Sequence, residues 1–355
     1  MSLRHMDNAW FRNNLAHSLG GKRHPFTGTF ELTWRCNLRC RHCYLGGQTF
    51  PLPELDTLSI QKLLDQVAEA GCLTLSITGG EPTLRQDFES IWQHAHGLGF
   101  LLNLFTNGTL IDESRAQFLA QHPPQNIEVS IYGTSPEIYK KVTGSAEAYE
   151  QAYQGIERMR ALDLPVMVKT MIQKDLADEA QAMVKKAKAQ GLRIRMDPGL
   201  DPRLDKNDEP LGYRIPAEQA ADLEMQAHDD IKRVKDYHQG WQEHPESWRR
   251  SPCGAGYQSF HLDPGGRLMP CMLLRQSIFE PLAGSFHEAW EAMGREGRVH
   301  FKESSPCYGC ELQHLCSQCP GIDALGQKPQ KRFDPEYYNC QVAQIRASML
   351  DSPGV

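Results

Sequence analysis

The chain has 355 residues, of which 40% are hydrophobic and 23% are charged, and its formal net charge is −6. This composition is typical of a globular protein, and the length suggests one large domain followed by a smaller one. Apolar runs fall short of the roughly eighteen residues of a membrane span, and the sequence shows neither a signal-peptide core nor a long Lys/Arg run. We therefore expect a cytoplasmic protein with no membrane and no nucleic-acid partner.

The region from residue 27 to 200 alternates short apolar runs with helical patterns, after an N-terminal segment over residues 1–26. Strands are predicted over 29–34, 73–80, 100–108, 126–133, 165–172 and 192–197, and helices over 58–71, 88–99, 113–121, 148–162 and 178–191. This alternation predicts a parallel sheet with helices packed outside it, as either an open barrel or a doubly wound sheet.

The rest of the chain differs in composition. Residues 201–250 are charged and contain a polar helical pattern over 216–238, so we interpret them as a linker with a surface helix. Residues 251–355 are rich in Cys, Gly and Pro and short on helical periodicity. Such a composition predicts a small domain built around metal rather than around an apolar core.

The 11 cysteines are the main clue to chemistry. In a reducing compartment, clustered thiols more often bind metal or take part in redox reactions than form disulfides. Cys72 stands alone in an apolar stretch, and we expect it to be a small buried hydrophobe. The others form two groups, Cys36, Cys40 and Cys43 near the start, and Cys253, Cys271, Cys307, Cys310, Cys316, Cys319 and Cys340 near the end.

The first group lies on the loop after the first predicted strand. In a parallel α/β barrel, functional groups collect at such carboxyl ends of strands. Three thiolates cannot saturate a four-iron cluster, so one iron would stay open for another ligand. The alternative is a zinc site, for which a fourth ligand such as His42 would be needed.

Further polar or glycine-rich segments end the next strands, at TGGEP (78–82), FTNGT (105–109) and VSIYG (129–133). Gly79 and Gly80 allow the backbone to approach a ligand closely, and Glu81 offers a carboxylate for an ammonium group. A glycine–acid turn alone is a weak signal.

Taken together, the CX3CX2C motif followed by an aromatic residue and the GGE turn resemble the radical S-adenosylmethionine (SAM) enzymes over residues 28 to about 197. The resemblance implies a partial (β/α)6 TIM-like barrel over residues 27–200. It implies that a catalytic [4Fe–4S] cluster is held by Cys36, Cys40 and Cys43, and that the SAM site contains Tyr44, Gly79, Gly80, Glu81, Asn107 and Ser130. Asn107 and Ser130 are the looser matches, because a turn residue and a strand-end hydroxyl would look the same.

The family chemistry is a one-electron cleavage of SAM, followed by removal of a hydrogen atom from the substrate by the 5′-deoxyadenosyl radical. A low-potential electron donor of the flavodoxin or ferredoxin type is therefore implied as a partner.

The last seven cysteines follow the pattern CX12GX4C, then CX2CX5CX2C, then C. A zinc ribbon would separate its CX2C pairs by about fifteen to twenty residues, and here only five intervene. The pattern resembles the SPASM domain, a small cysteine-rich α+β unit with two auxiliary [4Fe–4S] clusters, which brings the implied total to three. By position, one cluster would use Cys307, Cys310, Cys316 and Cys340. The other would use Cys253, Cys271 and Cys319, with its fourth site open or filled by substrate or a non-Cys ligand.

SPASM enzymes mostly modify peptides, so we expect an enzyme that matures a ribosomally made peptide, by a cross-link or into a peptide-derived cofactor. The first expected strand begins near residue 27, so a separate protein is expected to recognise a leader peptide.

Several alternatives stay open. The substrate could be a small molecule or a porphyrin, and a sulfatase-maturase-like enzyme is less favoured because Met272, not Asp, follows Cys271. A non-catalytic iron–sulfur or zinc protein would have no use for the GGE turn. Tyr132, Lys169 and Arg195 fall near the expected pocket but read equally well as structural residues.

Overall fold

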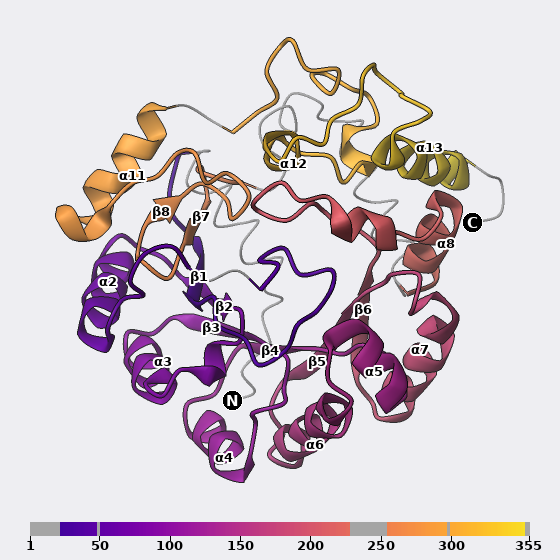
Figure 1. Cartoon of the computed structure of the whole chain (residues 1–355). Coiled ribbons are helices and arrows are strands. Elements are labelled where there is room, and N and C mark those ends of the chain that lie inside the picture. The colour runs from indigo at the N-terminus through magenta and orange to yellow at the C-terminus, as the bar shows by residue number, and fades with distance from the viewer. Residues whose placement is uncertain (1–21, 48–49, 228–253, 297–298, 352–355) are drawn as a thin grey trace, which may run out of the picture.

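A computed structural model describes residues 22–47, 50–227, 254–296 and 299–351 (Figure 1). The strand–helix alternation predicted for residues 27–200 is confirmed. It runs through β1 (Thr27–Thr33), α2 (Thr57–Glu69), β2 (Thr74–Gly79), α3 (Phe88–Gly97), β3 (Leu101–Thr106), α4 (Glu113–Gln121), β4 (Asn126–Ser130), α5 (Pro136–Thr143), α6 (Glu147–Ala161), β5 (Val166–Met171), α7 (Ala180–Ala189) and β6 (Arg193–Asp197).

The strand order distinguishes the two expected architectures. Strands β1 to β6 lie side by side in chain order, and each pairs in parallel with the next. A doubly wound sheet would reverse its order at a switch point, and β1 to β6 do not. Figure 1 shows the helices of this region outside the strands, so the fold is a partial barrel.

Local sequence explains these elements well. Helix α2 buries Ile60, Leu63, Leu64 and Val67, which recur at the spacing of one helix face. Its first turn is capped by Asp56, whose carboxylate accepts a hydrogen bond from the Ser59 amide at 2.8 Å. Each buried aliphatic side chain contributes about 1.5–3 kcal/mol of transfer free energy.

Helix α5 is an additional element between β4 and α6. Ser135 caps it, Pro136 starts it, and Gly144 ends it in the left-handed region at φ +82°. With only eight residues, it is too short for its periodicity to stand out from the sequence. It matters because its last carbonyl groups bind the cysteine loop described below.

The C-terminal residues continue the same sheet. They and the connecting region contain α8 (Ala217–Ala227), β7 (Ser259–Leu262), β8 (Leu268–Met269), α11 (Phe286–Arg295), α12 (Pro320–Ala324) and α13 (Tyr338–Asp351), with short 3-10 helices at Pro82–Leu84, Ala177–Glu179, Glu209–Tyr213, Pro281–Ala283 and Gln313–Leu315. Strand β7 pairs in parallel with β1, and β8 pairs antiparallel with β7. Hydrogen bonds therefore cross the border between the core and the cysteine-rich region. None of the described helices is both long and apolar enough to span a membrane.

Candidate active site

A cavity of about 730 Å³ opens at the carboxyl ends of the strands. Cys36, Cys40 and Cys43 line one wall, on the loop that follows β1. Its volume is within the usual range for a small-molecule site. This is the edge of the sheet at which the sequence placed the site.

The thiols of this loop are largely shielded from water and close to one another. Burial is the main cause that raises the pKa of Cys36, to about 11, and the Glu81 carboxylate and the Cys43 thiol add to it. Burial and the neighbouring thiols likewise raise the pKa of Cys40, and burial raises that of Cys43. The free thiols are therefore protonated at neutral pH, and binding of a metal or cluster must release their protons.

The backbone of the cysteine loop is held by α5. The amide of Arg39 donates to the carbonyl of Thr143 at 2.8 Å, and the amide of Arg41 donates to that of Val142 at 3.1 Å. Arg41 also forms an ion pair with Asp175 at 2.6 Å. These bonds hold the loop in place at Arg39 and Arg41.

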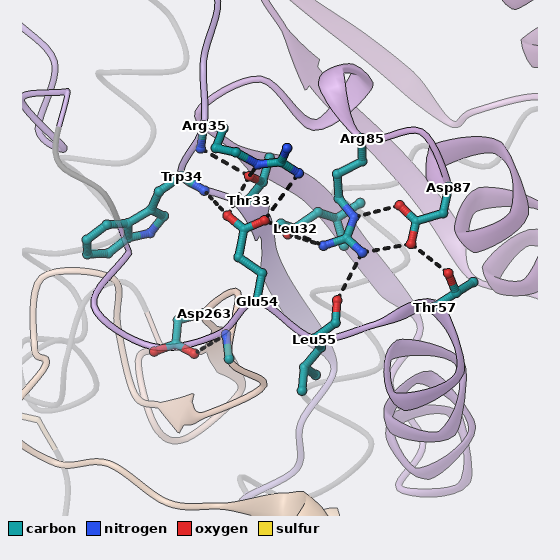
Figure 2. Close-up of polar contacts among 11 residues, drawn as sticks. Leu32, Thr33, Trp34, Arg35, Glu54, Leu55, Thr57, Arg85, Asp87 and Asp263 are labelled. Carbon is teal, nitrogen blue, oxygen red and sulfur yellow. Dashed lines mark hydrogen bonds and ion pairs between the residues drawn. The ribbon is translucent and has the colours of Figure 1, made fainter.

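The beginning of the loop is held by Glu54 (Figure 2). Its carboxylate accepts hydrogen bonds from the Thr33 hydroxyl at 2.6 Å and from the Trp34 amide at 3.1 Å. It also pairs with Arg35 at 3.4 Å and Arg85 at 3.8 Å. One carboxylate therefore ties the last residue of β1 to the first residues of the loop.

Arg85 connects β1 to the segment that follows Glu54 and to Asp87. Its guanidinium is almost fully buried and donates to the carbonyls of Leu32 and Leu55, each at 3.0 Å. Asp87 takes two further hydrogen bonds from Arg85, at 2.8 and 2.7 Å, and one from the Thr57 hydroxyl at 2.7 Å. Figure 2 shows this chain of contacts running from β1 to the start of α2.

The two glycines of the GGE turn line the cavity, but their small size serves a contact within the protein. A Cβ atom added at Gly79 would overlap the carbonyl oxygen of Thr33, and one at Gly80 would overlap that of Arg35. Gly79 also has φ +137°, a conformation open to glycine. The end of β2 can therefore press directly against the backbone that carries the first cysteine.

Glu81 is fully buried behind the turn. Its carboxylate accepts hydrogen bonds from the Asn107 amide at 2.7 Å, the Thr106 hydroxyl at 2.8 Å and the Thr83 amide at 3.1 Å. Burial raises the pKa of Glu81, and these hydrogen bonds act against that rise. Its oxygens are thus occupied by the end of β3 and its own turn.

The other expected contacts of SAM are found around the same cavity. Asn107 and Ser130 line it at the ends of β3 and β4. Tyr44 also lines it, but its hydroxyl donates to the buried Glu31 carboxylate at 2.8 Å. Burial raises the pKa of Tyr44 well above its ordinary value, so it stays a hydrogen-bond donor at neutral pH.

The cavity includes residues that sequence reasoning missed or left undecided. Asp201 and Arg203 line it, although the sequence assigned them to the linker, and Met272 brings in the C-terminal region. Burial raises the pKa of Asp201 to about 6. In the sequence, the one sign that the C-terminal region reaches the cavity was that Met272 directly follows Cys271, a predicted cluster ligand.

Of the three pocket candidates left undecided, Lys169 and Tyr132 line the cavity. The Lys169 ammonium lies 3.5 Å from a Glu128 oxygen and 3.8 Å from the centre of the Phe105 ring. Burial lowers the pKa of Lys169 to about 8 despite the Glu128 charge. Arg195 pairs with the same Glu128 carboxylate at 3.0 Å and is not among the residues that line this cavity.

The cysteines of the C-terminal region fall into two sets. Burial is the largest cause that raises the pKa values of Cys307 (to about 12), Cys316 (to about 11) and Cys340, and neighbouring thiols, including Cys310, raise them further. Burial raises the pKa of Cys319 to about 12, and the neighbouring Cys271 thiol adds to this rise. Cys253 lies outside the described residues.

Gln318 organises this region and was not expected from the sequence. It is buried; its amide nitrogen donates to Asp323 at 2.6 Å, and its oxygen accepts from Tyr337 and Asn339 at 2.8 Å each. Gln318 lies between Cys316 and Cys319 in the chain, and Asn339 directly precedes Cys340. These bonds therefore hold together segments that carry cysteines of both sets.

The three thiols of the cysteine loop fit an iron–sulfur cluster. Three thiols that share a cavity with a glycine turn provide three ligands and space for a further ligand at an open iron. None of the described cysteines forms a disulfide.

Comparisons with known proteins agree with this geometry. Residues 30–187 match the family model of the Radical SAM superfamily. An AdoMet-dependent heme synthase of Oleidesulfovibrio alaskensis is 34% identical over 147 residues, which cover 41% of this chain and only 38% of that protein. A PqqA peptide cyclase of Bradyrhizobium diazoefficiens is 27% identical over 317 residues, which cover 82% of this chain and 80% of that protein.

A solved structure shares the fold over nearly the whole chain. Streptococcus suis SuiB bound to its precursor peptide SuiA gives a TM-score of 0.67 at 15% identity, covering 97% of this chain and 84% of that one. The likeness therefore includes both the barrel and the cysteine-rich region.

Proposed function

We propose that this chain, which matches the Radical SAM superfamily model over residues 30–187, cleaves SAM reductively and removes a hydrogen atom from a peptide, maturing a ribosomally made peptide by a cross-link or into a peptide-derived cofactor. The observation that carries the proposal is the cavity that combines three thiols with a glycine turn and Ser130. The peptide substrate is supported by the peptide cyclase, which is similar over about four fifths of both chains.

In this proposal Cys36, Cys40 and Cys43 hold the catalytic cluster through their thiolates. The bound cluster supplies the electron that breaks a carbon–sulfur bond of SAM. Gly79, Gly80 and Ser130, which line the same cavity, would contact SAM. The backbone bonds from α5 and Glu54 keep the cysteine loop in place, because a shift of one ligand would alter the cluster.

The C-terminal cysteines are proposed to hold two auxiliary clusters. Cys307, Cys310, Cys316 and Cys340 would ligate one, and Cys271 and Cys319 together with Cys253 would ligate the other. We further propose a flavodoxin- or ferredoxin-type electron donor and a separate leader-recognition protein as partners.

The first test is the content of iron, sulfide and zinc per chain after anaerobic purification and reconstitution. Three four-iron clusters predict about 12 iron atoms and a similar amount of sulfide. Addition of SAM and a low-potential reductant should then yield 5′-deoxyadenosine. Cys36→Ala, Cys40→Ala and Cys43→Ala should each abolish that product, whereas Cys72→Ala, outside both groups, should retain it. A fully loaded chain that never forms 5′-deoxyadenosine would contradict the proposal.

A second candidate function is the modification of a porphyrin, favoured by the 34% identity to a heme synthase. That match covers 41% of this chain and 38% of the heme synthase. The substrate can be tested by comparing how a short peptide encoded beside the gene and a porphyrin precursor stimulate 5′-deoxyadenosine formation. Stimulation by the porphyrin alone would replace the peptide proposal.

A further inference from the structure

Asn107 points its amide nitrogen at the first cysteine of the loop. Its Oδ1 atom accepts hydrogen bonds from the Thr109 amide at 3.0 Å and from the Thr109 hydroxyl at 2.7 Å. A backbone N–H can only donate, so this side of the Asn107 amide must be the oxygen. The Nδ2 atom therefore faces the other way, where it lies 2.9 Å from Asn37 Oδ1 and 3.9 Å from Cys36 Sγ.

The main chain of Asn107 is held just as firmly. Its amide donates to the buried Glu81 carboxylate at 2.7 Å. The same carboxylate bonds the preceding residue, Thr106, through its hydroxyl at 2.8 Å. Asn107 is thus aligned at both ends by the protein alone, and needs no ligand in the cavity to adopt this direction.

A second donor approaches the second cysteine. Burial raises the pKa of the Cys40 thiol, and hydrogen bonding by the Tyr132 hydroxyl acts against that rise. The Tyr132 oxygen lies 3.3 Å from His42 Nε2. The fully buried Gln173 places its Nε2 atom 3.0 Å from His42 Nδ1. With Gln173 donating to Nδ1, His42 carries its proton on Nε2 and donates it to the Tyr132 oxygen. The Ser130 side chain also hydrogen-bonds the Tyr132 hydroxyl in the direction that lowers the Tyr132 pKa. With His42 and Ser130 both donating to the phenol oxygen, the phenol proton is left for the Cys40 sulfur.

We propose that Asn107 and Tyr132 are positioning residues that donate hydrogen bonds to the Cys36 and Cys40 sulfurs and thereby raise the reduction potential of the cluster bound there. This inference rests on the proposed function, since it concerns the same cluster. It gives Asn107 a role toward the cluster, in addition to lining the cavity that would hold SAM. Glu81 and Gln173 act one step further out, because they orient the two donors.

The physical reason lies in where the added electron goes. Reduction increases the negative charge on the cluster and on the thiolate sulfurs that hold it. A donor aimed at such a sulfur stabilises the reduced form more than the oxidised form, so hydrogen bonds to the sulfurs raise the potential. Removing either donor should make the cluster harder to reduce while leaving all three thiolate ligands in place.

The test is a redox titration of the reconstituted full chain, followed by electron paramagnetic resonance (EPR). The catalytic cluster is identified as the one whose signal changes on addition of SAM. We expect Asn107→Ser and Tyr132→Phe each to shift its midpoint potential to more negative values at unchanged iron content. The double variant should shift it further, because the two donors reach different sulfurs. Asn103→Ser, the same exchange at a residue of β3 whose amide nitrogen donates to Ser76 instead, should leave it unchanged.

The outcomes are distinguishable. Unchanged midpoints in fully loaded Asn107→Ser and Tyr132→Phe variants would overturn the inference while the proposed function stands. A wild-type chain with no SAM-responsive cluster would instead remove the proposed function. If Asn107→Ser fails to load iron, the Tyr132→Phe titration decides, supported by resonance Raman bands of the iron–cysteine bonds. These bands should move to higher frequency when a donor is lost.

Discussion

The guanidinium of Arg275 forms a hydrogen-bonded ion pair with the carboxylate of Glu31, a residue 244 positions earlier in the chain. One nitrogen of Arg275 lies 2.9 Å from Oε2 and 3.1 Å from Oε1 of Glu31. The same carboxylate accepts hydrogen bonds from the Trp34 indole and the Tyr44 hydroxyl, each at 2.8 Å. Glu31 is fully buried in β1. One carboxylate therefore joins β1, both sides of the cysteine loop and the C-terminal region.

Loss of the Glu31 charge should destabilise the fold. Burial alone would raise the pKa of Glu31, but the contacts with His261, the Arg275 charge and the Trp34 hydrogen bond outweigh it and hold the pKa well below its usual range. Glu31→Gln leaves the Arg275 charge buried without its partner, and breaking such a pair costs about 3–5 kcal/mol. We expect the urea unfolding midpoint to fall accordingly at pH 7.

The pH dependence of that difference follows from the sign of the shift. A carboxylate with a lowered folded-state pKa contributes stability above its unfolded pKa of about 4.3, and loses it as the pH falls through the folded value. The gap between wild type and Glu31→Gln should therefore narrow on acidification below about pH 5. Glu209→Gln, which breaks a half-exposed pair with Arg203, should cost no more than about 1 kcal/mol. Equal effects of the two exchanges would contradict this account.

Gly80→Ala should damage the site although it adds one methyl group. The new Cβ would overlap the backbone oxygen of Arg35, which cannot move without displacing the loop that begins at Cys36. We expect less iron per chain and a lower melting temperature. Gly97→Ala is the matched control, since its Cβ meets no atom within 4 Å at the end of α3. It should be neutral or stabilising by up to about 1 kcal/mol.

Binding in the cavity should depend on the charge of Lys169. With the pKa of Lys169 lowered to about 8 by burial, its ammonium is charged at pH 7 and largely neutral at pH 9. Only about a tenth stays charged one unit above the pKa, so an anionic group of SAM should lose up to about tenfold in affinity over that range. Equilibrium dialysis of the unreduced enzyme measures this. Lys169→Arg stays charged, so its SAM affinity should change little between pH 7 and pH 9. A wild-type affinity that does not change over this range would show that the Lys169 charge does not contribute to SAM binding.

The two groups of cysteines should separate by their effects on activity. Cys310→Ala should remove about four iron atoms yet leave SAM cleavage without peptide largely intact, because Cys310 belongs to the set far along the chain from the cavity thiols. Cys36→Ala should remove a similar amount of iron and abolish SAM cleavage. Iron analysis and 5′-deoxyadenosine quantification on the same samples give both readings. Loss of SAM cleavage in Cys310→Ala would contradict this prediction, because it would show that cleavage at the Cys36 group depends on the C-terminal cysteines.

The sequence by itself determined the strand–helix alternation of the barrel and the edge at which Cys36, Cys40 and Cys43 lie. These features depend on contiguous residues: the spacing of apolar side chains, caps such as Asp56, and thiols three and two residues apart. The cysteine spacing also predicted the superfamily whose model matches residues 30–187.

Only the tertiary structure decided which partners the polar residues take. Glu31 and Glu81 both lie beside short motifs, yet one is bound by Arg275 and the other by the end of β3, through contacts that no local pattern encodes. Strand β7 could not be assigned to the barrel sheet from its four residues, because pairing with β1 joins segments more than 200 positions apart. Local periodicity reports which face of an element is buried. The identity of the partner depends on chain segments that meet only when the barrel closes.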